Sequence, residues 1–105
     1  MTVNFSLKAN PTFTAKVGFK AAGQAEPVPV LLTFKHRTKT VLAKFLEERG
    51  DKTDAQMFFD MVIAWELEEP YNLVNVTELL ENHPVIALET FKVYIDELVQ
   101  GKIKN

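Results

Sequence analysis

The sequence contains no cysteine among its 105 residues. This absence excludes a disulfide framework, a thiolate metal site and a cysteine nucleophile, and it fits a reducing compartment. No apolar run approaches the roughly 20 residues that a membrane-spanning helix needs. The N-terminus, from Met1 to Ser6, lacks the basic stretch and the following apolar run of a signal peptide. We therefore expect no membrane partner.

Side chains suited to catalysis or metal binding are also scarce. Ser6 is the only serine, and His36 and His83 fall in predicted connections without the spacing of metal ligands. The four glycines are isolated, so there is no glycine-rich phosphate-binding loop. The carboxylates within residues 66–69 could form a glycosidase-like acid pair, but an exposed acidic loop is the better interpretation. The sequence thus predicts no enzymatic activity, no cofactor and no metal site.

Charge is unevenly distributed, although the net charge is only −2. Residues 1–50 hold eight Lys/Arg and three Asp/Glu, a balance of +5, whereas residues 51–105 hold four and eleven, a balance of −7. Such asymmetry suits a polar partner or head-to-tail self-association, although a fold that mixes both halves on its surface is the simpler interpretation. Together with unpaired strand edges and surplus apolar surface, described below, it leads us to expect that the chain self-associates. A basic cluster from Lys35 to Lys39 could contact phosphates, but the acidic overall balance is unlike that of nucleic-acid-binding modules. We expect a solvated junction there and no nucleic-acid partner.

The first third of the chain has the period of β-strands. Apolar residues alternate with polar or small ones over residues 13–20 and again over residues 28–35. Residues 21–27 read as a loop, so the two strands are predicted to form an antiparallel hairpin with one apolar face. Pro29 cannot donate a ladder hydrogen bond, so its strand must lie at an edge or have a free side there. Residues 5–7 are a candidate third short strand.

After residue 36 the period changes to that of α-helices. Four helices are predicted from capping and breaking residues, over approximately 38–50, 53–65, 72–82 and 84–100. In the last helix one apolar stripe is formed by Leu88, Phe91, Ile95 and Leu98. The expected fold is α+β, with an N-terminal β-hairpin followed by four packed helices. A single domain over residues 1–105 is expected, with residues 1–10 and 102–105 flexible.

The predicted second helix is apolar nearly all the way round. Phe58, Val62 and Trp65 are assigned to the core, but one small helix cannot bury its other flank unaided. Methionine and aromatic side chains repack readily and are suited to accept an apolar helix of a partner. The candidate partner-binding residues are Met57, Phe59, Ile63 and Tyr71.

The second half of the chain carries the most distinctive pattern. A Trp and an acidic stretch (residues 65–72) lead into a short helix, and a Leu-Leu pair then precedes a Pro (residues 76–84). The last helix carries an aromatic residue near its middle, and the chain ends in Lys104-Asn105. Residues 33–38 also connect the second strand directly to a helix. Over residues 10–105 this order of features resembles a family of phage tail assembly chaperones.

The resemblance implies a function in building the tail of a long-tailed phage or prophage. A member of this family would bind the tape measure protein, whose long apolar helices otherwise aggregate, and would help to recruit tail tube subunits. It would act in the host cytoplasm, have no enzymatic activity and be absent from the mature virion. Two alternatives remain, namely a structural tail or connector component that stays in the virion, and a small nucleic-acid-binding regulator whose affinity falls steeply with salt.

Overall fold

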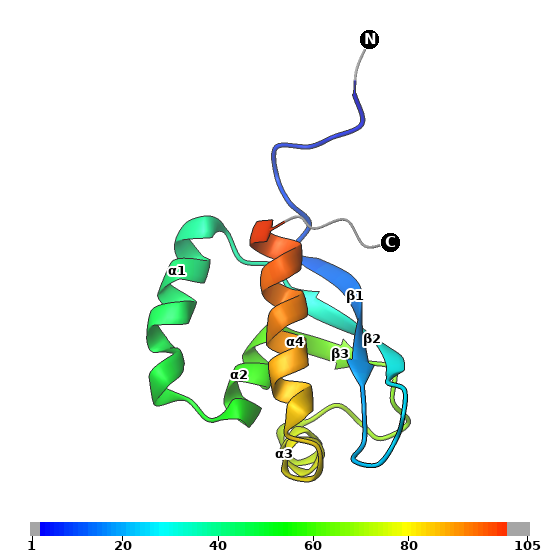
Figure 1. Cartoon of the computed structure of the whole chain (residues 1–105). Helices are drawn as coiled ribbons and strands as arrows, with labels where there is room; N and C mark the ends of the chain where they lie inside the picture. Colours follow the sequence, from blue (N-terminus) through cyan, green and yellow to red (C-terminus); the bar gives the residue numbers. More distant parts are fainter. Residues whose placement is uncertain (1–2, 101–105) are drawn as a thin grey trace.

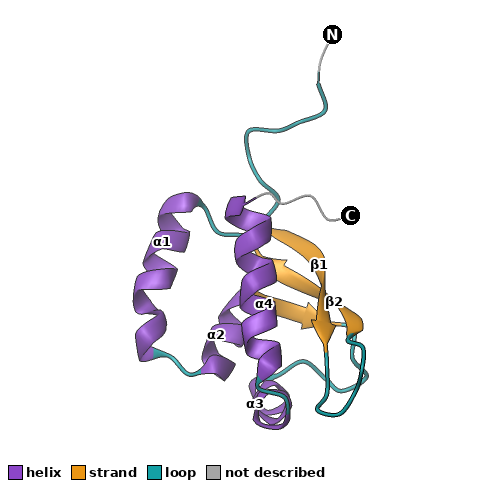
Figure 2. Ribbon diagram, in the orientation of Figure 1, coloured by secondary structure: helices purple, strands orange, loops and turns teal. Residues whose placement is uncertain are grey.

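The computed structural model describes residues 3–100 of the chain. Three strands form one antiparallel sheet in the order β1-β2-β3, namely β1 (Thr12–Phe19), β2 (Val28–Lys35) and β3 (Val62–Trp65) (Figure 1). The helices are α1 (Lys39–Glu48), α2 (Asp54–Met61), α3 (Leu73–Asn82) and α4 (Val85–Ile95), with a 3-10 turn η1 (Arg49–Asp51) and a π-helical turn η2 (Asp96–Gln100) (Figure 2). The predicted α+β fold with an N-terminal hairpin and four helices is confirmed.

The hairpin forms where the alternating pattern predicts it. Phe13 lies opposite Phe34 and Val17 opposite Val30, which puts apolar side chains of both strands on one face. Gly23 turns the chain between the strands with a φ of +88°, in the left-handed region that glycine adopts without strain. The apolar face of the hairpin is covered by helices, as a lone hairpin requires for stability.

Pro29 occupies a position where it breaks no ladder. It lies opposite Gly18 at the start of β2, whereas β3 pairs with β2 only from Leu32 onward. At the next position the N–H of Leu31 donates to the carboxylate of Glu66, at 2.8 Å. A side chain thus continues the hydrogen bonding of β2 beyond the end of β3. The sequence predicted that the strand of Pro29 lies at an edge of the sheet or has a free side at Pro29. The structure shows the second case, because β2 is the central strand and β3 does not reach Pro29.

The predicted helix over residues 53–65 is wrong beyond Met61. The chain leaves α2 there and pairs with β2 as β3, with Val62 opposite Phe34, Trp65 opposite Leu32, and a bulge between. β-Branched residues such as those at 62–63 pack well in a strand, and β2 offers them an open side. The apolar run that resembled an all-round apolar helix therefore serves a helix and a strand in turn.

Residues 3–10 contain no strand, so the prediction at residues 5–7 is also wrong. This segment is exposed and projects from the start of β1 (Figure 1). The predicted flexible tail at residues 102–105 lies outside the described residues.

The helices begin at caps that the local sequence indicates, and of the two candidates for the first helix, Thr38 and Thr40, the structure uses Thr38. The Thr38 hydroxyl accepts the N–H of Val41 at the start of α1, and Thr53 forms a reciprocal capping box with Gln56 at the start of α2. The Asn72 side chain caps α3 in the same way. These contacts satisfy amide groups that have no partner within their own helix.

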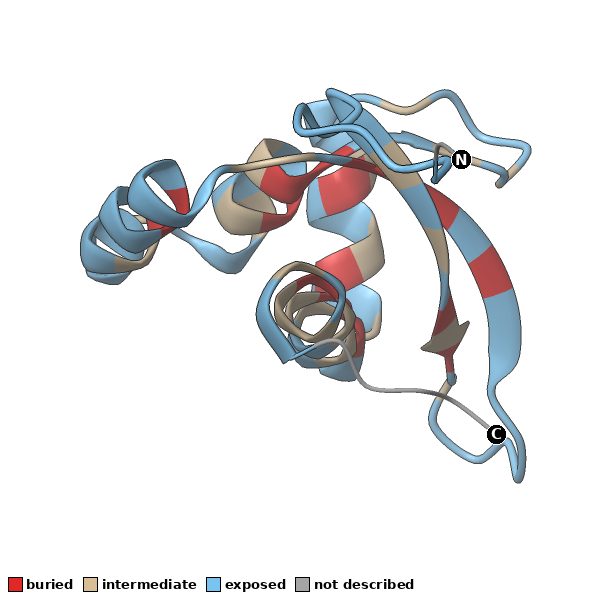
Figure 3. Ribbon diagram, turned by 90° about the horizontal axis from the view of Figure 1, so that it is seen from above, coloured by how far each residue is buried: buried red, intermediate tan, exposed pale blue. Residues whose placement is uncertain are grey.

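Helix α4 lies beside the curved sheet, and buried residues occur on both elements (Figure 3). Its buried side chains are Ile86, Thr90 and Tyr94, one on each successive turn. Of the predicted apolar stripe, Leu88 is 53% exposed, whereas Phe91, Ile95 and Leu98 are half-buried and pack against the core. Helix α4 is apolar on most of its circumference, so its sequence alone did not distinguish the face toward the sheet from the others.

The basic junction after β2 was predicted to be solvated, but one of its side chains, Arg37, is engaged in several contacts. Arg37 donates from Nη1 to the carbonyl of Asp60 at 3.0 Å and to the hydroxyl of Tyr94 at 2.9 Å. Its guanidinium lies 4.1 Å from the ring centroid of Phe45. The Tyr94 hydroxyl in turn donates to the carbonyl of Lys35 at 2.8 Å. Arg37 therefore links the end of β2 to α1, α2 and α4.

The two halves of opposite charge are packed together. Strands β1 and β2 come from the first half, and they pack against β3 and α4 from the second. The charge difference along the sequence therefore does not divide the molecule into a basic and an acidic lobe.

Candidate functional site

A groove of about 310 Å³ lies between α2 and α4. Its lining consists mainly of apolar side chains from the two helices: Met57, Met61, Ala87, Leu88 and Phe91, with Asp54 and Pro84. Met61 is buried, whereas Met57 and Phe91 are half-buried and Leu88 is exposed. The core thus has an apolar opening on this side of α4.

The apolar surface continues along α4 toward its C-terminal end. A second hollow of about 370 Å³ shares Phe91 with the groove and is lined further by Ile95, Lys92 and residues of η2. The guanidinium of Arg49 lies 5.3 Å from the ring centroid of Phe91. Together the two hollows form a path along one flank of α4, which we call the α2/α4 groove. Three residues of the predicted apolar stripe, Leu88, Phe91 and Ile95, line this path.

A second apolar cluster lies on the other flank of α2. Phe59, which is 39% exposed, stacks on Tyr71 with ring centroids 5.1 Å apart and an angle of 12° between the rings. Trp65 meets Tyr71 edge-on at 5.0 Å. The hydroxyl of Tyr71 donates to the carbonyl of Val62. We call Phe59, Tyr71 and the exposed Ile63 of β3 the aromatic surface.

Burial, together with the negative charge of Asp60, raises the pKa of Tyr71. The hydroxyl therefore stays protonated at neutral pH and remains a hydrogen-bond donor. The stacked ring pair is held in place by this bond on one side and by Trp65 on the other. A fixed aromatic pair is a favourable anchor for a protein partner because it loses little entropy on binding.

The structure divides the predicted partner-binding residues between two surfaces. Met57 lines the α2/α4 groove, whereas Phe59 and Tyr71 contact each other in the aromatic surface. Two residues apart on a helix, Met57 and Phe59 point in directions that differ by about 200°. Ile63 is 47% exposed on β3. Sequence analysis missed Leu88 and Phe91, and their only signal was that α4 has more apolar positions than one face can use.

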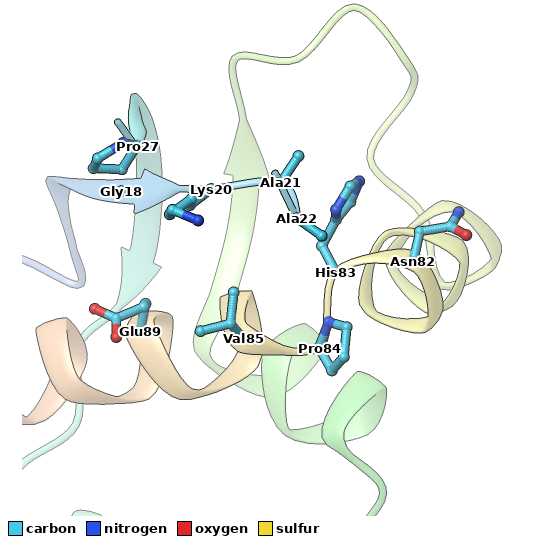
Figure 4. Close-up of a pocket in the computed structure, with 10 residues that line it drawn as sticks. All are labelled: Gly18, Lys20, Ala21, Ala22, Pro27, Asn82, His83, Pro84, Val85 and Glu89. Atoms are coloured by element: carbon cyan, nitrogen blue, oxygen red, sulfur yellow. The ribbon is translucent and has the colours of Figure 1, made fainter. Parts of the chain in front are cut away.

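A third hollow, of about 470 Å³, lies between the hairpin and the junction of α3 with α4 (Figure 4). Small and apolar residues line much of it, and its polar members are Lys20, Asn82, His83 and Glu89. Gly18 lies close to the loop here, since a Cβ at this position would lie 3.0 Å from Cβ of Pro27 and would need Pro27 to shift slightly. We call this space the hairpin hollow.

None of these surfaces has the chemistry of an active site. Within residues 3–100 no group of three or more His, Asp or Glu side chains is placed to hold a metal ion. The same part of the chain contains no helix that is both long enough and apolar enough to cross a membrane. The three surfaces are suited to contacts with other proteins, because each combines apolar lining with a few polar groups.

Comparison with known proteins assigns the chain to a family. No curated protein and no solved structure shows significant similarity to it. A family model described as phage tail assembly chaperone matches residues 1–105. Such proteins are assembly factors without enzymatic activity, in agreement with the expectation from the sequence. This match over its whole length means that the chain belongs to the phage tail assembly chaperone family.

Proposed function

We propose that this chaperone binds an apolar helical segment of the tape measure protein in the α2/α4 groove. The observation that supports this proposal most strongly is the exposure of apolar side chains along one flank of α4. Leu88 is 53% exposed, and it adjoins the half-buried Met57 and Phe91 in one groove. An amphipathic helix that lays its apolar face into such a groove would bury these side chains.

The chemistry of the groove suits a client whose sequence varies along its length. Met57 and Met61 are unbranched and polarisable, so they can adapt to different apolar side chains. Arg49 and Lys92 lie near Phe91 and provide cationic groups at the rim. Polar rim contacts of this kind orient a partner and add little affinity, whereas the apolar contacts supply most of it.

We further propose that the aromatic surface binds the tail tube protein. Phe59 and Tyr71 form a stacked pair at the surface, and the hydroxyl of Tyr71 donates to the carbonyl of Val62, which precedes the exposed Ile63 in β3. Because Met57 and Phe59 point in nearly opposite directions from α2, the two surfaces can be occupied at the same time. A chaperone that holds both partners would deliver tube subunits to the tape measure protein. It would work in the host cytoplasm and leave before the virion is complete.

Co-expression with the tape measure protein of the same phage tests the first proposal. We expect the wild-type chain to keep the tape measure protein soluble and to co-purify with it. Leu88→Glu places a charge in the groove at an exposed position, so it should abolish co-purification without changing the denaturation midpoint. Val74→Glu is the matched control, because Val74 is 75% exposed on α3 and lines none of the three surfaces. Full retention of the client by Leu88→Glu would refute the groove as its site.

The second proposal requires a separate readout with purified tail tube protein. Phe59→Ala removes half of the stacked pair, so capture of the tail tube protein should fall while binding of the tape measure protein persists. Purified virions provide a further test, because a structural component would remain in them and a chaperone would not. Equal capture of tail tube protein by wild type and Phe59→Ala would exclude the aromatic surface.

A further inference from the structure

The segment before β1 carries large apolar side chains with no contact to cover them. Val3, Phe5 and Leu7 are 83%, 90% and 105% exposed, respectively. In the isolated chain the segment is bent, and the N–H of Phe5 donates to the carbonyl of Val3 at 2.9 Å. Polar residues separate the three apolar side chains, so these share one face once the segment is extended. We call residues 3–10 the arm. Three exposed apolar side chains on one face of an extended segment are typical of a strand that lacks its sheet.

The outer side of β1 lacks a neighbouring strand. Within residues 3–100, β1 pairs with β2 alone, over eight residues without a bulge. Its free N–H and C=O groups are therefore a template for an added strand. The hairpin hollow opens beside the end of this edge, where Gly18 of β1 and Lys20, just after the strand, face Val85 and Glu89 of α4 across it (Figure 4).

We propose that the arm pairs in trans with the outer edge of β1 in a second copy of this chain. In this arrangement the arm runs antiparallel to the partner's β1. Its apolar face continues the apolar face of the sheet, and Phe5 fills the hairpin hollow beside Val85. The added backbone hydrogen bonds satisfy the edge, and the apolar side chains leave water.

The length of the arm excludes the same contact within one chain. Phe5 precedes Pro11 by six residues, a reach of at most about 22 Å. From Pro11 to Gly18 the chain extends over seven residues, or about 23 Å. To lie along its own β1 the arm would also have to reverse direction, which uses at least two residues. Phe5 therefore cannot reach the hollow of its own chain.

A second copy of the chain is the partner that covers both exposed elements, the arm and the outer edge of β1, in one contact. The arm directly precedes β1 in the chain, with bends at residues 4, 7, 8 and 11 (Figure 1). Once the arm straightens, an antiparallel pair of copies places each arm on the other's edge strand. This is a reciprocal two-fold contact, which closes without leaving a further arm or edge exposed. It is held by backbone hydrogen bonds and apolar burial, so it differs from the salt-sensitive head-to-tail contact suggested by the charge distribution.

The proposed contact leaves the client groove open. Glu89 faces the hairpin hollow and Phe91 the α2/α4 groove, and residues two apart on a helix point in directions about 200° apart. The dimer would therefore present two client grooves. Its failure would leave the proposed function intact, because Leu88 plays no part in the arm contact.

Sedimentation of the full chain over a range of concentrations tests the arm. We expect a dimer whose dissociation constant rises by at least about tenfold when Phe5 and Leu7 are both changed to Asp. Ser6→Asp adds a charge on the opposite face of the arm and should leave the dimer intact. Since all three positions are exposed, none of these changes threatens the fold. A wild-type chain that stays monomeric at every concentration would overturn the proposal. This holds also if the arm of that monomer binds a tail protein.

The absence of cysteine permits a positional test by disulfide formation. A Phe5→Cys chain mixed with a Val85→Cys chain should give a cross-linked heterodimer under mild oxidation. A Val74→Cys chain is the control, since Val74 lies on α3 and outside the hairpin hollow. Equal cross-linking of the two partners, or a dimer that persists unchanged in the double Asp variant, would overturn the arm contact.

Discussion

Tyr94→Phe should weaken the fold more than the loss of one hydroxyl group suggests. The Tyr94 side chain is fully buried, and its hydroxyl joins Arg37 on one side to the carbonyl of Lys35 on the other. Removing it leaves the Lys35 carbonyl without this donor and the guanidinium with one acceptor fewer. The ring stays, and with it the stacking on Phe34 at 5.5 Å and the edge contact with Phe45 at 6.2 Å.

The magnitude follows from the two bonds. A neutral hydrogen bond contributes about 1 kcal/mol and one to a charged group about 1.5–3 kcal/mol. Arg37 keeps its bond to Asp60, and the variant no longer has to desolvate a hydroxyl, so the two contributions do not add in full. We expect a loss of about 2 kcal/mol in the free energy of unfolding, which corresponds to a fall of about 8 °C in Tm for a chain of this length.

Urea denaturation followed by tryptophan fluorescence measures this change, because Trp65 is the only tryptophan. The midpoint should fall with no change in the slope m, as expected for a change in stability alone. Arg37→Met and the double variant complete a cycle, in which the two losses should be strongly non-additive. A loss below about 0.5 kcal/mol, or additive losses, would refute the view that Arg37 and Tyr94 act as one unit.

Three further predictions follow from individual side chains. Trp65→Ala should lower the free energy of unfolding by about 2–3 kcal/mol, which is less than for a fully buried tryptophan because Trp65 is half-buried. The lost contacts include the hydrogen bond from its Nε1–H to the carbonyl of Glu69, at 2.7 Å. A loss under about 1 kcal/mol would mean that Phe58 and Tyr71 keep their places without the tryptophan ring. Thr90→Val should stabilise the chain by up to about 1 kcal/mol, since its buried hydroxyl has no partner within residues 3–100; Thr77→Val, whose hydroxyl donates to the carbonyl of Leu73, is the control that should not gain. Burial raises the pKa of both Tyr71 and Tyr94, although Arg37 acts in the opposite direction on Tyr94. Above about pH 10 these hydroxyls ionise more readily in the unfolded chain than in the folded one. Their contribution to the free energy of unfolding is therefore full below about pH 10 and falls as the pH rises above it. The denaturation midpoint of Tyr94→Phe should therefore fall less steeply between pH 10 and pH 11 than that of the wild type, and equal slopes would contradict this.

The parts of the fold that were predictable from sequence rest on local signals. The hairpin follows from alternation with a period of two, and the starts of α1, α2 and α3 follow from Thr38, Thr53 and Asn72, whose side chains cap their own helices. Each of these signals depends on residues within a few positions of one another. No distant contact is needed to interpret them.

The errors occurred where a distant contact decides the structure. Residues 57–65 fit a helical period, yet the chain leaves the helix after Met61 because β2 offers an unpaired side to Val62 and its neighbours. That open side is a property of the assembled sheet, so no local pattern indicates it. Similarly, Arg37 looked like one of several surface cations, and only the fold brings Tyr94 and Asp60 to it from remote positions.

The candidate site was half predictable for the same reason. An excess of apolar residues around Met57 and Phe59 indicated a partner surface, but whether two such residues act together depends on the helix that carries them. The helix places them on opposite flanks, so one predicted surface became two. Leu88 is absent from the predicted partner-binding residues because it belongs to an apolar stripe, and such stripes are more often buried than exposed.

The circumference of α4 connects these observations. Ile86, Thr90 and Tyr94 face the sheet, Leu88 and Phe91 face the α2/α4 groove, and Val85 with Glu89 faces the hairpin hollow. A helix that covers one sheet needs one apolar stripe, and the surplus on α4 is only partly used in the isolated chain, where Phe91 packs against the core and Leu88 is exposed. If the groove holds the tape measure protein and the hollow holds the arm of a second copy, each apolar side of α4 has a partner. The same arrangement explains why the sequence did not predict which face of α4 packs on the sheet. Three apolar stripes overlap on this helix, so no single period identifies the buried one.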